Sequence, residues 1–541
     1  MNDQARTKPS LWERSTTRRL FRWLFSWRGI RRVLIVLAWA VTVVGLLYGE
    51  ENWRGRRAWN RYREAAEARG VSFDLRSFIP KPVPDEQNFA ATPFLKSFLL
   101  PPNFSILTND LWFRAINNIA ATNIEKDKGR RHFTDLVAWQ AAAAALQSGP
   151  LTRQQKFETD KTDLASRAAA APAILEGMMP DAAAFAELRA ASTRQFSRYP
   201  LVYDLENPCA TLVPHLARVN GVCSRLSLEA CAELAAGQSD QALADVKLIL
   251  DLADSIKSEP FLISFLVRAG CLQIAIQPVW EGLAEHRWTD AQLQELQARF
   301  SSYDFLADLQ PTLKAERASG LVMVDLGRKM GLGVFAGLVD GAEDGASQAN
   351  AQDDNVALYL LVRGIPSGWY YQEKLNYSTL YDARMDGVVD LAAKTVSPRK
   401  DASNAGEVNR QIGGSPGWMV PFNIILHHRI IAAMLLGSSG SPIPAARAQT
   451  AADQAALACA LERYRLANGQ FPETLAALAP RFISRAPNDV ITGQPYKYRR
   501  ADDGQFILYS VGWNEKDDGG VPGNVLFDQK EGDWVWSYPA K

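Results

Sequence analysis

The most distinct feature of the hydrophobic pattern is an uninterrupted apolar run near the N-terminus. Residues 33–48 (VLIVLAWAVTVVGLLY) contain no charged side chain. The run is slightly shorter than the roughly 20 residues with which a helix crosses a bilayer. Trp27, Tyr48 and Trp53 lie near its two ends, where aromatic side chains settle at membrane interfaces. The pattern therefore predicts a single transmembrane helix over 33–48.

Basic residues around the run indicate its orientation. The segment 1–32 is rich in arginine, and the positive-inside rule places such a segment in the cytoplasm. A cleaved signal peptide is the alternative, but the basic leader is long for one and the A-x-A sequence at 38–40 lies inside the apolar run. We therefore expect an uncleaved anchor among the lipids of a bacterial inner membrane, with everything after residue 49 in the periplasm. The arginines nearest the run on its N-terminal side are Arg18, Arg19, Arg22, Arg28, Arg31 and Arg32, and Arg54, Arg56 and Arg57 follow it.

The segment 49–130, directly after the anchor, contains a run rich in proline and phenylalanine (SFIPKPVPDEQNFAATPFL). Proline disfavours helix at its own position and at the position before it. The segment therefore predicts an extended stalk and linker. We expect it to pack onto the rest of the protein through Phe89, Phe94 and Leu95.

Helical periodicity dominates residues 131–330, which are rich in alanine, a residue of high helix propensity. Around Gly237 the pattern separates two helices, and Ser239 or Asp240 is the expected N-cap of the second. Thr289 is the expected N-cap of a later helix. These patterns predict an α-helical domain. The apolar residues at helical spacing in the helix after Gly237 are Leu243, Val246, Leu250 and Ala253.

Polar stretches interrupt the helical pattern further along the chain. Residues 331–355 are rich in Gly, Ala and Asp, and they lack the strand and the Lys-Ser/Thr pair of a phosphate-binding loop. They predict a flexible loop. Residues 356–444 predict a second helical segment, within which 398–417 reads as a polar linker.

The composition supports a folded chain of more than one domain. Of the 541 residues, 47% are hydrophobic, and 60 Lys and Arg nearly balance 59 Asp and Glu, so there is no electrostatic reason to expect a nucleic-acid partner. The five cysteines form no C-x-x-C and no short pattern with histidine, which argues against zinc. Cys209 and Cys223 would form a disulfide in an oxidising compartment. Buried free thiols are the alternative that we favour.

No motif identifies a catalytic site. Residues 413–417 match G-x-S-x-G, but a polar stretch precedes them and Pro416 follows the serine, whereas a nucleophile elbow needs a strand before it and a helix directly after it. His427 and His428 interrupt an apolar stretch, which predicts an amphipathic helix packed on the body rather than a second membrane span or a metal site. An enzyme would need polar residues remote in sequence to converge, for example a Glu or Asp pair with perturbed pKa.

The C-terminal stretch 445–541, hereafter the C-terminal module, begins with a helical pattern. Leu457, Leu461 and Tyr464 lie on one face of the predicted helix. The helix is expected to end at Asn468-Gly469, because glycine accepts the left-handed conformation that closes a helix. Pro472 suits the first turn of a short second helix.

The rest of the C-terminal module predicts an antiparallel sheet. Tyr496 and Tyr498 alternate with basic residues, which is the period of a half-buried strand. The turn sequence at 502–504 separates this strand from a second apolar run at 506–510.

The order of these elements resembles the globular domain of the major pseudopilin of type II secretion. The runs that carry the resemblance are ALERYRLANGQFPETLAAL, DVITGQPYKY and LYSVGWNEKDDGG, within roughly residues 450–530. The chain departs from that family because the Gly-Phe cleavage point and the glutamate of the pseudopilin membrane helix are missing. A large helical body also separates the anchor from the C-terminal module. We therefore expect a pilin-type head on a helical body rather than a pilus subunit.

The resemblance implies a calcium site, because major pseudopilins bind calcium in the loop after the last strands. In this chain the loop is 512–520, where Asn514, Asp517 and Asp518 offer oxygen ligands. An acidic turn in which Asp side chains accept from their own backbone is the alternative, and Lys516 inside the loop favours it.

The sequence as a whole predicts a mainly α protein with an N-terminal single transmembrane helix, a large α-helical periplasmic body and a small C-terminal α+β module with an antiparallel sheet. The expected function is non-enzymatic protein–protein contact in envelope assembly or secretion. One alternative is a helical protein that holds a peptide or small ligand in an apolar cleft lined by Trp280, Trp288 or Trp369. The other is an envelope hydrolase without a recognisable motif.

Overall fold

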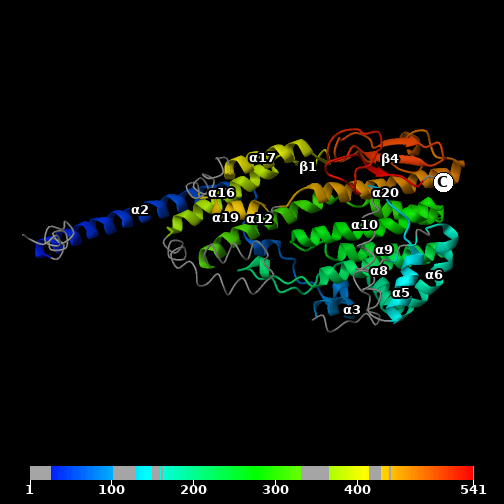
Figure 1. Cartoon of the computed structure of the whole chain (residues 1–541), viewed down its shortest axis with the longest axis horizontal. Coiled ribbons are helices and arrows are strands. Elements are labelled where there is room, and N and C mark those ends of the chain that lie inside the picture. Colours follow the sequence, from blue (N-terminus) through cyan, green and yellow to red (C-terminus); the bar gives the residue numbers. More distant parts are fainter. Residues whose placement is uncertain are drawn as a thin grey trace, which may run out of the picture. The chain divides into compact units, whose positions relative to one another are not determined.

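The computed structural model describes residues 26–100, 129–148, 157, 159, 162–330, 365–413, 428–437 and 440–539. It is 64% helical and 5% strand, which confirms the predicted mainly α class (Figure 1). The chain divides into two compact units. The small unit comprises residues 1–70, 324–377 and 424–434, and the large unit comprises 71–323, 378–423 and 435–541. The predicted flexible loop 331–355 lies outside the described residues.

The small unit contains a single long N-terminal helix, α2 (Trp27–Glu67, 41 residues). The Ser26 hydroxyl caps it by accepting from the backbone N–H of Gly29 at 3.0 Å. Its apolar stretch is exposed, whereas Trp59 and Ala66 further along are buried. The predicted extended stalk is therefore wrong for residues 49–67, which continue the helix because no proline occurs between the start of α2 and Pro80.

The rest of the small unit comes from parts of α12 (Phe305–Met330), α16 (Ser367–Met385) and α19 (Ile430–Gly437). α2 and α16 meet at glycines, since a Cβ on Gly55 would lie 2.2 Å from the carbonyl oxygen of Gly368. The Glu373 carboxylate caps α19 by accepting from the N–H groups of Ile430 (2.6 Å) and Ala432 (3.2 Å). α19 begins after His428, and His427 lies outside the described residues.

The large unit is built around helices that pack side by side (Figure 1). They are α8 (His215–Ala235), α9 (Ser239–Ser255), α10 (Leu262–Ala284), α11 (Asp290–Ser301) and α20 (Ile443–Asn468). The predicted apolar face of α9 is buried, and Thr289 caps α11 in a capping box with Gln292, as expected. The predicted cap of α9 is wrong. Ser239 is already helical, and Ser239 and Asp240 accept from the Gln292 side chain instead.

A second apolar cluster forms where α5 (Leu136–Ser148) packs on α6 (Leu164–Met178) and α6 packs on α8. α7 (Ala182–Ala191) follows α6 through the single 3-10 turn η6 (Met179–Asp181) and contacts α9. A further turn, η7 (Pro208–Ala210), precedes α8.

Most of the segment 75–100 consists of short helical turns rather than an extended chain, but residues 80–84, which contain three prolines, belong to no helix or strand, as expected around proline. Phe89, Phe94 and Leu95 are buried in the main core, as predicted from their apolar character. Asn88 ties the segment down, because its side chain donates to the carbonyl of Arg198 at 2.9 Å. The turns are η1 (Leu75–Phe78), η2 (Asp85–Gln87), η3 (Phe89–Ala91), α3 (Pro93–Lys96) and η4 (Ser97–Leu99).

Residues 389–413 carry a small hairpin and a helix. β1 (Val389–Asp390) pairs antiparallel with β2 (Thr395–Val396), and α17 (Pro398–Gly413) follows. The predicted polar linker at 398–417 is therefore wrong up to Gly413, because Pro398 occupies the first helical position, where its missing N–H is not needed. The rest of the G-x-S-x-G match lies outside the described residues.

The C-terminal module contains α20, the 3-10 helix η8 (Leu475–Leu478) and an antiparallel sheet of β3 (Lys497–Arg500), β4 (Phe506–Ser510) and β5 (Trp534–Trp536) in the order β3-β4-β5. α20 ends at Asn468, and Gly469 follows in the left-handed conformation (φ 80°), as predicted. Pro472 lies before η8 rather than in its first turn, and its carbonyl accepts from the Tyr498 hydroxyl at 2.7 Å.

The C-terminal module belongs to the large unit and is not a separate compact body. α20 packs against α10 and α11, and its side chains from Ala455 to Glu462 are all buried. The Trp280 indole on α10 donates to the carbonyl of Ser537 at 3.0 Å. Gln454 on α20 donates to the carbonyl of Trp534 at 2.7 Å. The predicted boundary at 445 therefore does not separate two compact bodies.

Candidate functional site

The predicted calcium loop, 512–520, is folded on its own side chains. The structure brings Asn514 and Asp518 together, with 3.4 Å between the Asn514 amide nitrogen and an Asp518 carboxylate oxygen. Lys516 donates to the other Asp518 oxygen at 2.6 Å. Asp517 instead accepts from the Tyr509 hydroxyl and the N–H of Gly519, each at 3.1 Å. The three predicted ligands therefore have different hydrogen-bond partners.

Asp533, which the sequence analysis did not single out, holds this loop closed. Its two carboxylate oxygens accept from the N–H groups of Asp518 (3.2 Å) and Gly520 (2.6 Å). The bond from Lys516 holds the pKa of Asp518 below its usual range, and the N–H of Gly519 does the same for Asp517. Both carboxylates are thus ionised at neutral pH, as a calcium ligand must be, but protein donors already occupy them.

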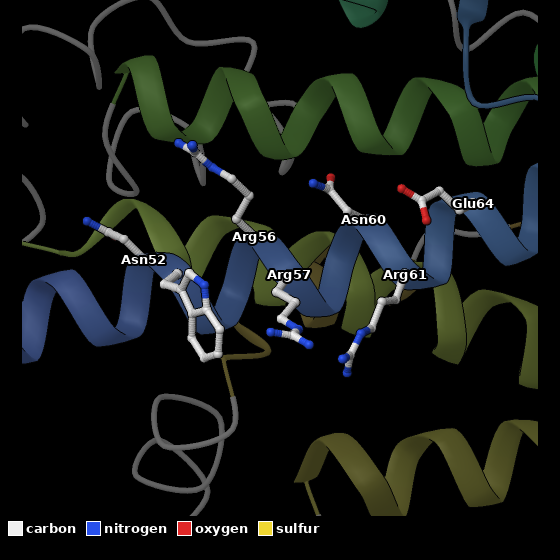
Figure 2. Close-up of a pocket in the computed structure, with 7 residues that line it drawn as sticks. Asn52, Arg56, Arg57, Asn60, Arg61 and Glu64 are labelled. Carbon is white, nitrogen blue, oxygen red and sulfur yellow. The ribbon is translucent and has the colours of Figure 1, made fainter.

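A groove of about 520 Å³ runs along α2 beyond its apolar stretch. Figure 2 shows Asn52, Arg56 and Asn60 on one side of the helix and Arg57 and Arg61 on another, and Trp53, four residues before Arg57, also lines the groove. Each set follows the i, i+4, i+8 spacing of one helix face. The Arg57 guanidinium lies 5.0 Å from the centroid of the Trp53 ring. This part of α2 therefore presents cationic and aromatic groups together.

The tryptophans that were expected to line an apolar cleft lie elsewhere. Trp280 and Trp288 are buried in the core, and their indole N–H groups donate to backbone carbonyls. Trp369 borders a cavity of about 10 Å³ beside Glu373 and Ile430. Such a volume holds about one water molecule. The ligand-binding alternative thus gains no support from these side chains.

The most unusual group of side chains is a cluster of carboxylates between α8 and α9, here called the carboxylate cluster: Glu229, Glu233 and Asp245. Carboxylate oxygens of the three residues lie within 4.8 Å of one another. Glu229 and Glu233 are one turn apart on α8, so they lie on the same face of the helix. α9 turns back after Gly237, which adopts φ 78°, and brings Asp245 against that face.

The carboxylate cluster is buried and has little compensating charge. Asp245 is fully buried, Glu233 is 7% exposed and Glu229 is half-buried. Arg189 on α7 forms an ion pair with Asp245. Arg225, one turn before Glu229, is instead paired with Asp181. One carboxylate oxygen of each cluster residue is buried and accepts no hydrogen bond from the part of the chain that the structure describes.

The electrostatics follow from this burial. Loss of water raises the pKa of Glu229, Glu233 and Asp245 because it disfavours the charged form. The neighbouring negative charge of Asp245 raises the pKa of both glutamates further, whereas Arg189 opposes the rise for Asp245. The cluster can therefore bind protons or a cation at a pH where isolated carboxylates are ionised.

Another buried carboxylate, Glu281, has a full set of hydrogen-bond donors and a cationic partner. Glu281 on α10 accepts from the N–H and hydroxyl of Thr134 (2.8 and 2.6 Å) and from Gln277 (2.9 Å), and it is paired with Arg167. Buried charges in proteins are normally compensated in this way. The carboxylate cluster departs from that rule.

Sequence reasoning did not single out the carboxylate cluster, because glutamates one turn apart are common on helices. A weaker signal was available. Glu233 lies in an apolar stretch (EACAELAAG) and has no basic residue three or four positions away on either side. A charged residue without such a neighbour on a helix of small apolar residues indicates a buried carboxylate. Asp245 could not be assigned to the same site without knowing how α8 and α9 pack.

The fold and the site define a mainly helical protein with a long apolar N-terminal helix, a C-terminal three-stranded antiparallel sheet and a buried carboxylate cluster. No protein-family model, curated protein or solved structure matches the chain.

Proposed function

We propose that the protein is a single-pass inner-membrane protein that holds its large unit in the periplasm for non-enzymatic contact with other envelope proteins. The observation that supports this most is the apolar stretch of α2. None of its strongly apolar window is buried in the described structure, and side chains such as Val36, Trp39 and Leu46 are each more than two-thirds exposed. A continuous apolar surface of this kind needs lipid or another protein to cover it.

The flanks of the stretch support a membrane position. Trp27 and Trp53 lie at its two ends at 83% and 61% exposure, as expected for side chains at bilayer interfaces. The basic groove of Figure 2 follows directly and would face lipid phosphates. Among the described residues, one other apolar helix is long enough to cross a membrane: α10, which is more than half buried in the large unit, as expected for a core helix.

The C-terminal module supports the choice of partner. Its order of long helix, short helix and antiparallel sheet is the order expected for a pseudopilin-like head, and on that resemblance we propose envelope or secretion proteins as partners. Calcium at Asn514, Asp517 and Asp518 belongs to the same proposal. It would have to displace Lys516 from Asp518.

Three measurements test the proposal. A reporter that is active only in the periplasm, fused after residue 541, should be active, and the same reporter placed before residue 27 should be inactive. The protein should also stay in the membrane fraction after alkaline carbonate washing. A photo-crosslinking amino acid at Val202 or Leu212, which are 88% and 80% exposed, should capture envelope proteins. Release by carbonate, or capture of no envelope or secretion protein, would contradict the proposal.

The carboxylate cluster favours one second candidate, an envelope hydrolase. Convergent carboxylates with raised pKa can serve as general acid and base. The test is hydrolysis of glycoside, peptide and ester substrates by the detergent-solubilised full chain. Activity that Glu233→Gln abolishes, without a change in circular dichroism, would favour this candidate over the first.

A further inference from the structure

We propose that the carboxylate cluster binds one divalent cation that prefers oxygen ligands, such as Mn²⁺, Mg²⁺ or Ca²⁺. The ligands are Glu229 and Glu233 from α8 and Asp245 from α9. This site lies in the helical part of the large unit and shares no residue with the loop 512–520. It does not depend on the proposed membrane anchoring.

The spacing of the oxygens fits an ion of this kind. Mg²⁺ and Ca²⁺ hold oxygen ligands at roughly 2.0–2.6 Å, so two ligands of one ion lie at most about 5 Å apart. The cluster oxygens lie within 4.8 Å of one another. An ion at their centre would thus be in reach of all three carboxylates after small side-chain adjustments. Water would fill the remaining positions, as is usual for Mg²⁺ sites.

The unpaired oxygens point to a missing partner. The Oδ2 atom of Asp245 and the Oε2 atom of Glu233 are buried and accept no hydrogen bond within the described chain, although each residue is more than nine-tenths buried. A buried acceptor without a donor costs about 1–3 kcal/mol, and a charged one costs more. Glu281 on the next helix, with its four interactions, shows that this fold can satisfy a buried carboxylate.

Charge balance indicates the valence of the partner. The ionised cluster carries three negative charges, and Arg189 supplies one positive charge through Asp245. Arg225 is neutralised by Asp181 and leaves the balance unchanged. A net charge of minus two remains, and one divalent cation cancels it. Bound protons are the competing solution, so the site must be tested with metal and without it.

The outer part of the cluster is only partly covered by the protein. Glu229 is half-buried, and the side chain of Arg189 is 35% exposed. The cluster therefore lies near the surface of the large unit, at the edge formed by α7, α8 and α9. Asp245 is its fully buried member, and Glu229 is its most exposed member.

The experiment uses the full chain in detergent after removal of metals with a chelator. Mn²⁺ is titrated in, and the electron paramagnetic resonance signal of free Mn²⁺ reports how much is bound. We expect wild type to bind one Mn²⁺ whose affinity falls at least tenfold in Glu233→Gln and in Glu229→Gln. The matched control is Asp517→Asn with Asp518→Asn, which removes the loop carboxylates and should leave this ion in place.

Thermal unfolding gives a second readout that a purely structural role would not change. Without metal, Glu233→Gln should melt at the same temperature as wild type or higher, because it removes a buried carboxyl group whose Oε2 atom has no donor in the described chain. With saturating Mn²⁺, wild type should melt higher than the variant, because the ion binds only the folded state. No bound Mn²⁺, binding lost only in the loop variant, or the same Mn²⁺ effect on both proteins would overturn the proposal. If Glu233→Gln fails to fold, Glu229→Gln at the half-buried position takes its place.

Discussion

At the scale of single residues, buried carboxylates in the large unit differ in how they are stabilised. Glu259 accepts from Ser264 and contacts the His215 ring at 2.7 Å, and Glu281 has a full set of donors. Glu233 has neither. The cost of burying a carboxylate depends on such donors, because water is no longer present to solvate the charge.

Asp453 on α20 provides a pH-dependent prediction. It is buried, and it accepts from Gln449 and from the Tyr496 hydroxyl, each at 3.0 Å. Burial raises its pKa from 3.8 to about 7, and nearby Asp489 adds to the rise, whereas the two hydrogen bonds and Lys394 oppose it. Between these values the folded state keeps a proton that the unfolded state has lost. The Asp453 contribution to the free energy of unfolding therefore falls as pH rises from about 4 to 7.

Asp453→Asn should remove this part of the pH dependence, because asparagine cannot ionise. Relative to wild type, the variant should gain stability as pH rises from about 4 to 7, by roughly 4 kcal/mol at most. Urea unfolding at several pH values measures this. Asp502→Asn in the exposed turn before β4 is the matched control. A constant difference between Asp453→Asn and wild type across this range would contradict the prediction.

At the scale of secondary-structure elements, sequence prediction succeeds where local signals decide the structure. The stop of α20 at Gly469 and the Thr289 cap of α11 follow from the chemistry of one or two residues. It fails for α17, a helix that starts at Pro398, because its polar composition indicated a linker. It also fails for the carboxylate cluster, because the contact between α8 and α9 depends on tertiary packing rather than on local sequence.

Glycines on α10 provide a paired prediction at this scale. A Cβ on Gly282 would lie 2.1 Å from Nε1 of Trp288, which is buried and donates to the carbonyl of Val279. Gly282→Ala should therefore destabilise the protein by about 1–3 kcal/mol through overpacking. A Cβ on Gly270 would meet only the Asn220 side chain at 3.9 Å, so Gly270→Ala should stabilise by up to about 1 kcal/mol through helix propensity. Thermal unfolding of both variants should show shifts of opposite sign, and shifts of the same sign would refute this packing argument.

At the scale of the whole molecule, the C-terminal module and the helices before it form one core within the large unit. α20 contributes to this core along most of its length. Gln454 on α20 donates to the carbonyl of Trp534 in β5, and Trp280 on α10 donates to the carbonyl of Ser537 just after β5. A pilin-like head would be expected to fold by itself. Here its long helix covers α10 and α11, which would otherwise expose apolar surface.

This shared core leads to a prediction about cooperativity. Segments that unfold together show the same free energy of opening in native-state hydrogen exchange, whereas an independent domain shows its own. We expect the slowest amides of α20 and β4 to converge with those of α8 and α10 as denaturant is added, in the full chain held in detergent. The exposed amides at the 502–504 turn should exchange quickly throughout and serve as the internal control. If α20 and β4 instead open together at a clearly lower free energy than α10, the C-terminal module is a separate folding unit despite its packing. The C-terminal module would then resemble a pilin-like head both in the order of its elements and in its ability to fold independently of the helices before it.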